Sequence, residues 1–497
     1  MAEITNRSLN EETITITRRE YDDLIRVKID NDYLKQELAQ LKRMIFGAKS
    51  ERYVPQPLEQ LTLGLITPEE KKPEPKIETV TFNRKKKEPT KTIGHARTSL
   101  PSHLPRVETI IEPEGDLTGA KKIGEEITEL LEYKQGSIYV KRIVRPKYAL
   151  PEEKGIVIGI LPSQPISRGN AGPGLLAQLI IGKYCDHLPF YRQVQQFKRL
   201  NVDLAESTLN GWFRSACELM EPLSNKLRER VRKTNYLQAD ETPIPVQTKE
   251  KQGATHKGYL WVYHAILLKL VFFDYRKTRS GEGPDDFLKD FNGTLQSDGY
   301  EVYAHLGNKK GITLLACMAH ARRKFEQAQQ NDHVRAEYML KNIQLLYSVE
   351  REAREKKLTH EERKMLRIEK SSKVLVETEA WLKDEITKVL PKSSIGKAIS
   401  YTMKLWPRLK RFMDDGMYEI DNNLIENSIR PVAIGRKNYL FAGSHEAAER
   451  AAMIYSFMGS CKMNGIEPYE WLKEILEKLP DTKMSELDSL LPDNWKK

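Results

Sequence analysis

The chain has 497 residues, too many for one hydrophobic core, so several domains are expected. Apolar residues make up 39% and charged residues 30%, which is typical of a folded chain and excludes a largely disordered one. Lys and Arg number 81 against 70 Asp and Glu, giving a net charge of +11. This excess permits nucleic-acid binding, and it equally fits a basic solvated surface.

Neither a membrane span nor a disulfide framework is expected. No run of about 18 apolar residues occurs, and the N-terminal MAEITNRSLNEE has no apolar signal core, so a cytoplasmic protein is expected. The four cysteines are far apart and form no CxxC pair, which favours buried free thiols; they are Cys185, Cys217, Cys317 and Cys461.

The first element expected along the chain is a helix over residues 21–46. Positions at alternating spacings of 3 and 4 form one series, namely Leu24, Val27, Asn31, Leu34, Leu38, Leu41 and Ile45. This pattern is the a/d seam of a coiled coil, in which a buried Asn favours a defined register and a parallel dimer. The alternative is a helix that packs on the body of its own chain.

A linker and a small β-rich module are expected next. Six prolines interrupt residues 47–100, and Arg84-Lys85-Lys86-Lys87 form a basic run that either contacts phosphate or is solvated. Residues 101–150 include SIYVKRIVRPKYAL, whose alternating apolar positions predict a strand.

Residues 174–227 have a helical pattern. LLAQLIIGKYC predicts one helix, Pro189 begins a second, and Ser207 can cap a third. The second and third, joined by a short turn, resemble a helix-turn-helix, whose second helix can enter the DNA major groove. A plain helical bundle explains the same pattern.

Residues 236–328 change to strand-like runs. These are NYLQADETPIPVQ, GYLWVYHAI, LKLVFFDY, GTLQSD and GITLLACMA, with one short helix expected at GYEVYAHLG. Three strands followed by strand, helix and strand is the order expected of an RNase H-like sheet. A charged helical stretch over residues 321–414 then predicts an inserted helical subdomain.

Three carboxylates stand out in this order. Asp240 and Asp298 are each predicted to end a strand, and Glu426 lies in the first turn of a predicted helix. Two divalent cations about 3.5–4 Å apart need several oxygen ligands, which such a trio supplies for phosphoryl transfer.

Each carboxylate also has a purely structural explanation. Asp298-Gly299 is a common turn dipeptide, and Asp240 before Glu241 and a proline can simply close a strand. Glu426 fits a variant capping box in which it bonds back to the Asn423 amide. These alternatives stay open on the spacing alone.

Longer runs around the trio resemble the transposases of insertion-sequence family sixty-six, a group of bacterial DDE transposases. The matching runs are ADETPIPV, LQSDGYEVY, CMAHARRKF, IDNNLIENSIRPVAIGRKNYLFAGS and SCKMNGIEPYEWL, with LKRMIFGAKSER and LPSHLPRVE upstream. They occur in the family's order, and the run over residues 420–444 is long enough to be highly specific.

The resemblance implies an α/β fold with helical modules, built on an RNase H-like catalytic core in which Asp240, Asp298 and Glu426 are the catalytic residues and metal ligands. Mg²⁺, for which Mn²⁺ can substitute, would serve cleavage at the terminal inverted repeats and attack of the freed 3′-hydroxyl on target DNA. It also implies a homodimer or higher oligomer, possible small companion proteins encoded nearby, and a cytoplasmic, nucleoid-associated bacterial protein. The alternatives are a transposase-derived regulatory protein and another RNase H-like nuclease.

The expected domains follow from these patterns. They are an N-terminal helix or coiled coil (1–50), a basic linker (51–100), a β-rich module (101–165), a helix-turn-helix-like region (166–233), the first part of the core (234–328), a helical insertion (329–415), the second part of the core (416–440) and a C-terminal helical region (441–497). Family members often carry cysteine pairs in the β-rich module. This chain has no cysteine before Cys185, so no structural zinc is expected.

Basic residues near the trio are expected to contact DNA phosphates. They are Arg322, Arg323, Lys324, Arg430, Arg436 and Lys437. Arg430 can instead pair with Glu426 one helical turn away. His320 and Asn423 are expected to support the trio rather than to bind metal. Tyr439 stands where the family has Trp, and it can stack on a base or fill the core.

Deleting residues 1–46 is expected to weaken self-association, because the deletion removes the predicted coiled-coil seam. Light scattering on the full-length and shortened chains measures this directly. An unchanged oligomer would leave the helix without a role in assembly.

Overall fold

The computed structural model describes residues 4–7, 13–16, 136, 138–144, 147–149, 156–158, 161–167, 169–248 and 254–495. The chain divides into two compact units, Met1–Gly159 and Ile160–Lys497. The helix expected over residues 21–46, with its coiled-coil seam, and the expected linker lie outside the described residues, as does most of the expected β-rich module.

The first unit contains two antiparallel strand pairs. β1 (Ile4–Arg7) pairs with β2 (Thr13–Ile16), and β3 (Lys147–Ala149) pairs with β4 (Ile156–Ile158). The strand predicted across SIYVKRIVRPKYAL is wrong for residues 138–144, which form no strand and leave Tyr139 and Val140 largely exposed. Within the described part of that run, β3 alone has a pairing partner, and alternation without a partner does not make a strand.

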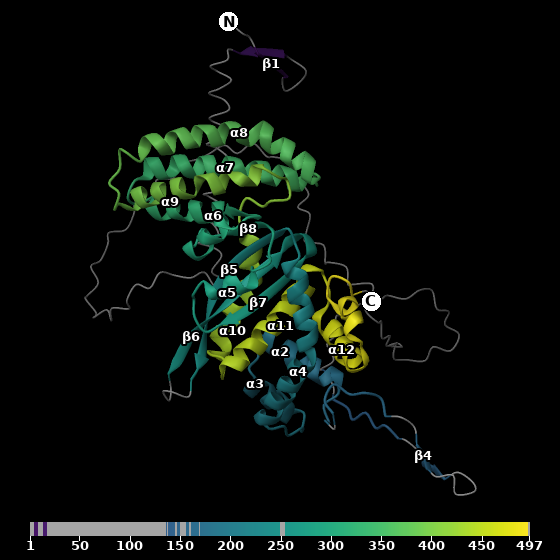
Figure 1. The fold of residues 1–497 in the computed structure, drawn as a ribbon. Helices are drawn as coiled ribbons and strands as arrows, with labels where there is room; N and C mark the ends of the chain where they lie inside the picture. The colour runs from purple at the N-terminus through teal and green to yellow at the C-terminus, as the bar shows by residue number, and fades with distance from the viewer. Residues whose placement is uncertain are drawn as a thin grey trace, which may run out of the picture. The chain divides into compact units, whose positions relative to one another are not determined.

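The second unit is built on one five-stranded mixed sheet (Figure 1). Its strands are β5 (Tyr236–Gln247), β6 (Thr255–Ala265), β7 (Leu270–Arg276), β8 (Gly293–Ser297) and β9 (Ile312–Ala316). The order across the sheet is β7-β6-β5-β8-β9; β5, β6 and β7 are antiparallel, and β8 and β9 run parallel to β5. All five predicted strands are confirmed.

Short helices connect several of these strands. The 3-10 helix η3 (Glu301–Asn308) joins β8 to β9 where a short helix was predicted. The helix α5 (Glu282–Phe287) between β7 and β8, and the 3-10 helix η2 (Ile266–Leu268) between β6 and β7, were not predicted.

Three helices precede the sheet, as predicted. They are α2 (Pro173–Tyr184), α3 (Phe190–Arg199) and α4 (Glu206–Arg232). Pro189 begins α3 as expected, but Ser207 does not cap α4, because the helix already begins at Glu206 and Ala205 is its N-cap. A buried apolar stripe along α4 belongs to the same core as the sheet, whereas the side chains of its first turns are largely exposed. This packing is compatible with both interpretations of the helix pair.

The edge strand β7 is covered by α11 (His445–Met463). Ser456 and Ser460 on α11 accept hydrogen bonds from the backbone N–H groups of Phe273 and Val271, at 2.8 and 3.0 Å. Unpaired edge N–H groups are otherwise a template for pairing with another chain. Between the two serines, Gly459 permits the close approach, since an added Cβ would lie 2.6 Å from Val271 Cγ1.

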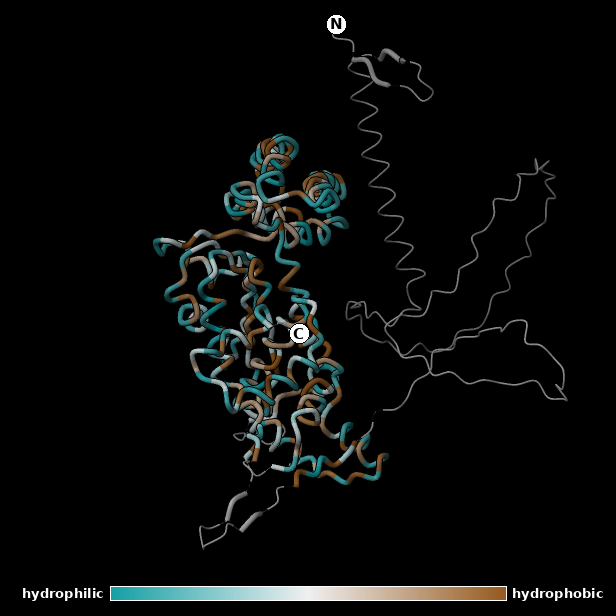
Figure 2. The backbone as a smooth tube through the Cα atoms, turned by 90° about the vertical axis from the view of Figure 1, so that its right-hand side faces the viewer, coloured by the Kyte–Doolittle hydropathy of each residue, from teal (hydrophilic) through white to brown (hydrophobic). Residues whose placement is uncertain are grey.

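Four helices inserted after β9 form a second hydrophobic core. They are α6 (Met318–Ala328), α7 (His333–Glu355), α8 (His360–Glu385) and α9 (Ser394–Leu409), followed by the 3-10 helix η4 (Lys410–Met413). Asp332, Thr359 and Ser393 cap the last three α-helices through their side chains. Hydrophobic and hydrophilic residues alternate along them (Figure 2), as expected of helices buried on one side.

The chain then returns to the sheet. α10 (Asn423–Tyr439) crosses β5 and β6, and α11, α12 (Pro468–Lys478) and the 3-10 helices η5 (Leu479–Asp481) and η6 (Met484–Leu490) complete the fold. Among the described residues, no helix is both long enough and apolar enough to span a membrane.

A buried ion cluster fixes the segment that leads into α10. Glu350 on α7 is held by Arg363 and Arg367 on α8, with Arg367 Nε 2.7 Å from Glu350 Oε1. Arg367 Nη2 also donates to Glu350 Oε2 at 2.9 Å, and the other three Arg367 N–H groups donate to the backbone carbonyls of Phe412, Asp415 and Tyr418. Since all five guanidinium N–H groups have acceptors, this fully buried arginine is satisfied.

Replacing Arg367 by Met is expected to destabilise the helical insertion by about 3–5 kcal/mol, because it leaves Glu350 buried with one partner fewer. The matched control is Lys370→Met on the same helix, which removes an exposed pair with Glu352 and should cost about 1 kcal/mol or less. Urea unfolding followed by circular dichroism compares the two. Equal midpoints for both variants would contradict a structural role for the cluster.

Candidate active site

Asp240 and Asp298 lie just beyond the parallel pairing of β5 and β8. That pairing joins residues 236–238 to 294–296, and β8 ends at Ser297. The prediction for Asp240 was wrong in one respect, because β5 does not end there: its antiparallel pairing with β6 continues to Gln247, and Asp240 is paired with Val262. Asp240 is therefore mounted on a rigid inner strand.

Asp298 is fixed by a tight turn. Its Oδ1 accepts a hydrogen bond from the Tyr300 N–H at 2.8 Å, and Gly299 between them has φ +88°, which favours glycine. Tyr401 of α9 donates its hydroxyl to the Asp298 carbonyl at 2.5 Å. The turn expected from the Asp-Gly dipeptide is thus present, and it holds the Asp298 carboxylate near enough to Asp240 for its charge to act there.

A buried hydrogen-bond network connects the sheet to the segment before α10. The Gln296 side chain on β8 accepts from Tyr236 at 2.6 Å and from Gln238 at 2.9 Å, both on β5. The same two glutamines donate to the carbonyls of Glu419 and Asp421, each at 2.8 Å. The chain entering α10 is therefore positioned by the two strands that position Asp240 and Asp298.

Glu426 lies in the first turn of α10, as predicted, but the capping box does not form. The Asn423 N–H donates to Asp421 Oδ1 at 3.0 Å, and the Asn423 side chain donates to Asp421 Oδ2 at 2.8 Å. The structural explanation for Glu426 is thereby removed. Its carboxylate instead faces α6, with Oε1 3.6 Å from Arg323 Nη2 and 4.0 Å from His320 Nε2.

The three carboxylates interact electrostatically. Burial raises the pKa of Asp240 to about 8, and the negative charges of Glu241, Asp298 and Glu426 contribute in the same direction. A hydrogen bond from the Glu241 N–H to Asp240 Oδ1, at 2.8 Å, opposes part of this effect. Asp298, in the turn after β8, and Glu426, on α10, are therefore near enough for their charges to act on Asp240 of β5; these three residues are called the acidic centre below.

Glu241 is a fourth acidic group that the sequence prediction treated only as part of a strand end. Its side chain is 4% exposed and is bound by Arg279, whose guanidinium lies 4.1 Å from the Tyr300 ring centroid. Burial raises the pKa of Glu241, Arg279 opposes the rise, and Asp298 adds to it. Burying two consecutive acidic side chains in a strand costs free energy, so such a pair suggests a functional role. The Asp240-Glu241 pair within an apolar run was the sequence signal that could have identified Glu241.

The donor set suits a hard divalent cation. All of these groups offer carboxylate oxygens, and the raised pKa of Asp240 shows that the centre favours added positive charge. Among the described residues, no three His, Cys, Asp or Glu side chains are already arranged as a metal site. Asp240, Asp298 and Glu426 are the residues that could hold a hard cation such as Mg²⁺, because carboxylate oxygens are its preferred protein ligands.

Basic side chains on α6 border the acidic centre. His320 and Arg323 contact Glu426, and Arg323 Nη1 is 3.5 Å from His320 Nε2. Burial lowers the pKa of His320, Asp298 and Glu426 oppose this shift, and Arg323 and Lys324 add to it. Lys324 Nζ lies 5.6 Å from the Tyr401 ring centroid, and Arg322 forms a helical pair with Glu326 at 3.0 Å.

The basic residues of α10 have different environments. Arg430 and Lys437 are exposed, and among the described residues Arg430 forms no ion pair with Glu426. Arg436 is half-buried and donates to Thr242 Oγ1, at 3.2 Å, and to the Pro243 carbonyl, so it ties α10 to β5.

Tyr439, at the end of α10, is partly buried. Its hydroxyl is hydrogen-bonded to that of Tyr455 on α11. This environment supports the interpretation of Tyr439 as packing against the core, although part of the side chain also lines a pocket.

Gln296→Leu is expected to destabilise the protein by about 1–3 kcal/mol, because Tyr236 and Gln238 lose a buried acceptor. Gln247→Leu, at the exposed end of β5, is the matched control and should change the stability by less than about 0.5 kcal/mol. Thermal unfolding measures both. A Gln296→Leu variant as stable as the control would show that the network is dispensable.

Comparisons with known proteins agree on one family. The model of the Transposase IS66 family matches residues 168–450, that of the IS66 C-terminal element matches residues 456–492, and that described as Transposase C of IS166 homeodomain matches residues 33–109. No solved structure matches this chain.

Two relatives from Sinorhizobium fredii (strain NBRC 101917 / NGR234) are similar over most of their length. Uncharacterized protein y4jD is 32% identical over 507 residues, which cover 96% of this chain and 97% of the relative. Uncharacterized protein y4qI is 33% identical over 436 residues, covering 84% and 80%. With the family model matched across the sheet, the helical insertion and α10, the chain belongs to the IS66 family of transposases.

Proposed function

We propose that this protein is a DDE transposase that binds the terminal inverted repeats of its own insertion sequence, cleaves DNA there and joins the freed ends to target DNA. The observation that carries the proposal is the convergence of Asp240, Asp298 and Glu426 from β5, the turn after β8 and α10. The strand order β7-β6-β5-β8-β9, with two parallel strands beside β5, supports an RNase H-like core.

Asp240, Asp298 and Glu426 would hold Mg²⁺, for which Mn²⁺ can substitute, and Glu241 lies close enough to add negative charge. The bound cations would supply the charge that activates a water or 3′-hydroxyl and stabilises the leaving oxygen. The rigid mounts of the two aspartates, on β5 and in the Asp298 turn, fix where the reacting phosphate can lie. No covalent link between protein and DNA is required.

The basic residues bordering the centre are suited to hold DNA. Arg323 and Lys324 project from α6 next to Glu426, and Arg430 and Lys437 are exposed on α10. Each phosphate contact of this kind adds to the affinity and to its dependence on salt. Arg436 also ties α10 to β5 through Thr242, and Arg322 pairs with Glu326 one turn along α6.

Two alternatives remain distinct from this proposal. A transposase-derived DNA-binding protein would not need the acidic centre, and another RNase H-like nuclease would not need an N-terminal assembly helix. The presence of all three carboxylates favours an active enzyme over the first. Cleavage and strand-transfer assays separate all three possibilities, because only a transposase joins the freed end to a second duplex.

Asp298→Ala is expected to keep binding to duplexes that carry the terminal repeats and to lose Mg²⁺-dependent strand cleavage by at least about a hundredfold, a typical cost of removing one charge-stabilising group. Asp290→Asn, an exposed residue in the loop before β8, is the matched control and should cleave normally. Gel-shift and cleavage assays on the same DNA give both readouts. Full cleavage by Asp298→Ala would exclude the assigned centre.

Glu426→Gln provides the second test. Because Glu426 makes no capping bond, the neutral variant should unfold within about 0.5 kcal/mol of the parent. It should bind the repeats and fail to cleave them. If cleavage survived, α10 would carry no part of the acidic centre.

A further inference from the structure

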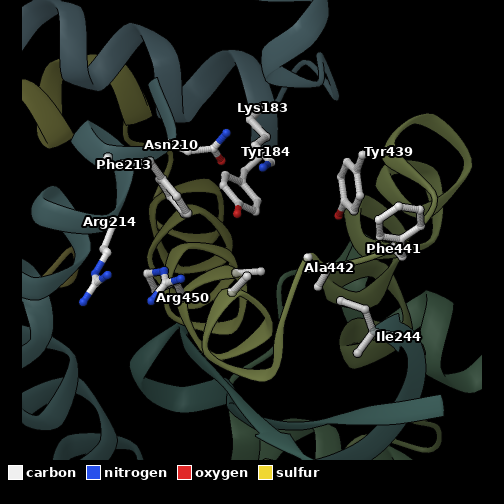
Figure 3. Close-up of a pocket in the computed structure, with 14 residues that line it drawn as sticks. Lys183, Tyr184, Asn210, Phe213, Arg214, Ile244, Tyr439, Phe441, Ala442 and Arg450 are labelled. Carbon is white, nitrogen blue, oxygen red and sulfur yellow. The ribbon is translucent and has the colours of Figure 1, made fainter. Parts of the chain in front are cut away.

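A pocket of about 350 Å³ lies at the opposite end of α10 from Glu426 (Figure 3). Its lining comes from α2, the first turns of α4, the strand β5, the end of α10, and α11. On β5, residues 240, 242 and 244 share one face of the sheet, since side chains alternate along a strand. Asp240 belongs to the acidic centre, Thr242 binds Arg436 of α10, and Ile244 lines the pocket. The pocket is therefore on the face of the sheet that carries the carboxylates.

Three cations line the pocket, and two of them lack an ion pair within the described part of the chain. Arg214 is paired with Glu218 at 2.8 Å. Lys183 and Arg450 have no carboxylate within ion-pair distance among the described residues, and Arg450 Nε is buried there without a hydrogen-bond partner. The positive charge of Arg450 does contribute to lowering the pKa of Glu446, one turn earlier on α11.

Lys183 is packed among aromatic rings, and these cation–π contacts offset part of the cost of burying its charge. Its Nζ lies 4.1 Å from the Phe190 ring centroid, and burial lowers its pKa to about 8. Cys217 and Glu206 on α4 oppose this shift, and Arg450 on α11 adds to it. An anion bound in the pocket would relieve the repulsion between Lys183 and Arg450.

Aromatic side chains occupy both sides of the same pocket. Figure 3 shows Tyr184 and Phe213 on one side and Tyr439 and Phe441 on the other. Phe441 is 40% exposed, so it presents a ring to the solvent, whereas Tyr184 and Phe213 are buried and stack on each other at 5.6 Å. The hydroxyl bond to Tyr455 fixes the Tyr439 ring. Aromatic rings beside unpaired cations are the two components that bind a nucleobase and its phosphate.

We propose that this pocket takes one unpaired nucleotide of a DNA strand, with its base against the exposed Phe441 ring and its phosphate near Lys183 and Arg450. The proposal rests on the proposed function, because it assumes that DNA lies across α10. The volume is at the small end of the range for ligand pockets, roughly 300–1,000 Å³, which suits one nucleotide.

The spacing suits a strand that also reaches the acidic centre. Residues 240 and 244 are about 13 Å apart along β5. Residues 426 and 439 are about 20 Å apart along α10. At roughly 3.4 Å per nucleotide step, the pocket lies about four to six steps from the phosphate that would be cleaved.

Gly211 offers a way to fill the pocket without disturbing the core. It lines the pocket from α4, and a Cβ added there meets no atom within 4 Å. Gly211→Phe should therefore occupy the pocket, and Gly211→Ala is the matched control that leaves it open and favours the helix. Phe441→Ala removes one exposed ring, and its matched control is Tyr191→Ala, a 62% exposed ring on α3 outside the pocket.

The experiment measures the affinity of the full-length protein for labelled DNA by fluorescence anisotropy, in a buffer that contains EDTA. The probes are a fully paired terminal-repeat duplex and a series with one unpaired nucleotide at successive positions. The parent should bind one position about tenfold more tightly, which is about 1.4 kcal/mol and within the range for stacking one base on an aromatic ring. Gly211→Phe and Phe441→Ala should lose this preference and keep their affinity for paired DNA, whereas both controls should keep it.

Equal affinity of the parent for all probes would overturn the proposal, and so would a preference that survives in Gly211→Phe. Competition with dAMP separates a free nucleotide from a strand: displacement by dAMP without any preference among the duplexes would also overturn it. Since EDTA removes divalent cations, the preference is measured independently of cleavage. A preference without Mg²⁺-dependent cleavage would count against the proposed enzyme and leave the pocket assignment intact.

Discussion

The arrangement of the acidic centre depends on how the chain is held as it leaves the helical insertion and enters α10. On one side, Arg367 binds three backbone carbonyls between residues 412 and 418 while it neutralises Glu350. On the other side, Gln238 and Gln296 bind the carbonyls of residues 421 and 419 from inside the sheet. Because these bonds are buried or partly buried, exchanging them for bonds to water has a cost. These bonds therefore fix where α10 begins, and the position of Glu426 in its first turn is fixed with it.

This constraint gives the helical insertion a physical role. The insertion separates Glu426 from the two aspartates in sequence, yet its own core includes Ala316, the last residue of β9, and Ile420, just before α10. Its helix α6 also brings His320 and Arg323 to the Glu426 carboxylate. The two ends of the insertion are thus fixed to the same sheet. Its length therefore does not change the position of Glu426 relative to Asp240 and Asp298.

The sequence predicted the elements better than the bonds between them. The strands β5 to β9 were predictable because their apolar runs are long and bounded by turns. The predicted run NYLQADETPIPVQ covers all of β5, but Asp240 was wrongly placed at a strand end, because only the antiparallel pairing with β6 sustains β5 past the parallel ladder. The capping box at Glu426 does not form because the Asn423 N–H donates its hydrogen bond to the Asp421 carboxylate instead. Gln238 and Gln296 carry no local pattern at all, because their partners lie far along the chain.

The helix α10 connects the acidic centre with the opposite end of the site. Its first turn carries Glu426, and Arg436 in its last turn binds β5. Beyond it, Ala442 pairs with β5 through backbone bonds to Pro245 and Gln247, at 2.9 and 2.8 Å. A helix fixed at both ends to one strand cannot slide along it, so the separation between the carboxylates and the pocket residues is set by the backbone. Two groups held at a constant spacing on one face can engage successive parts of the same DNA strand, and a shift of α10 would displace both together.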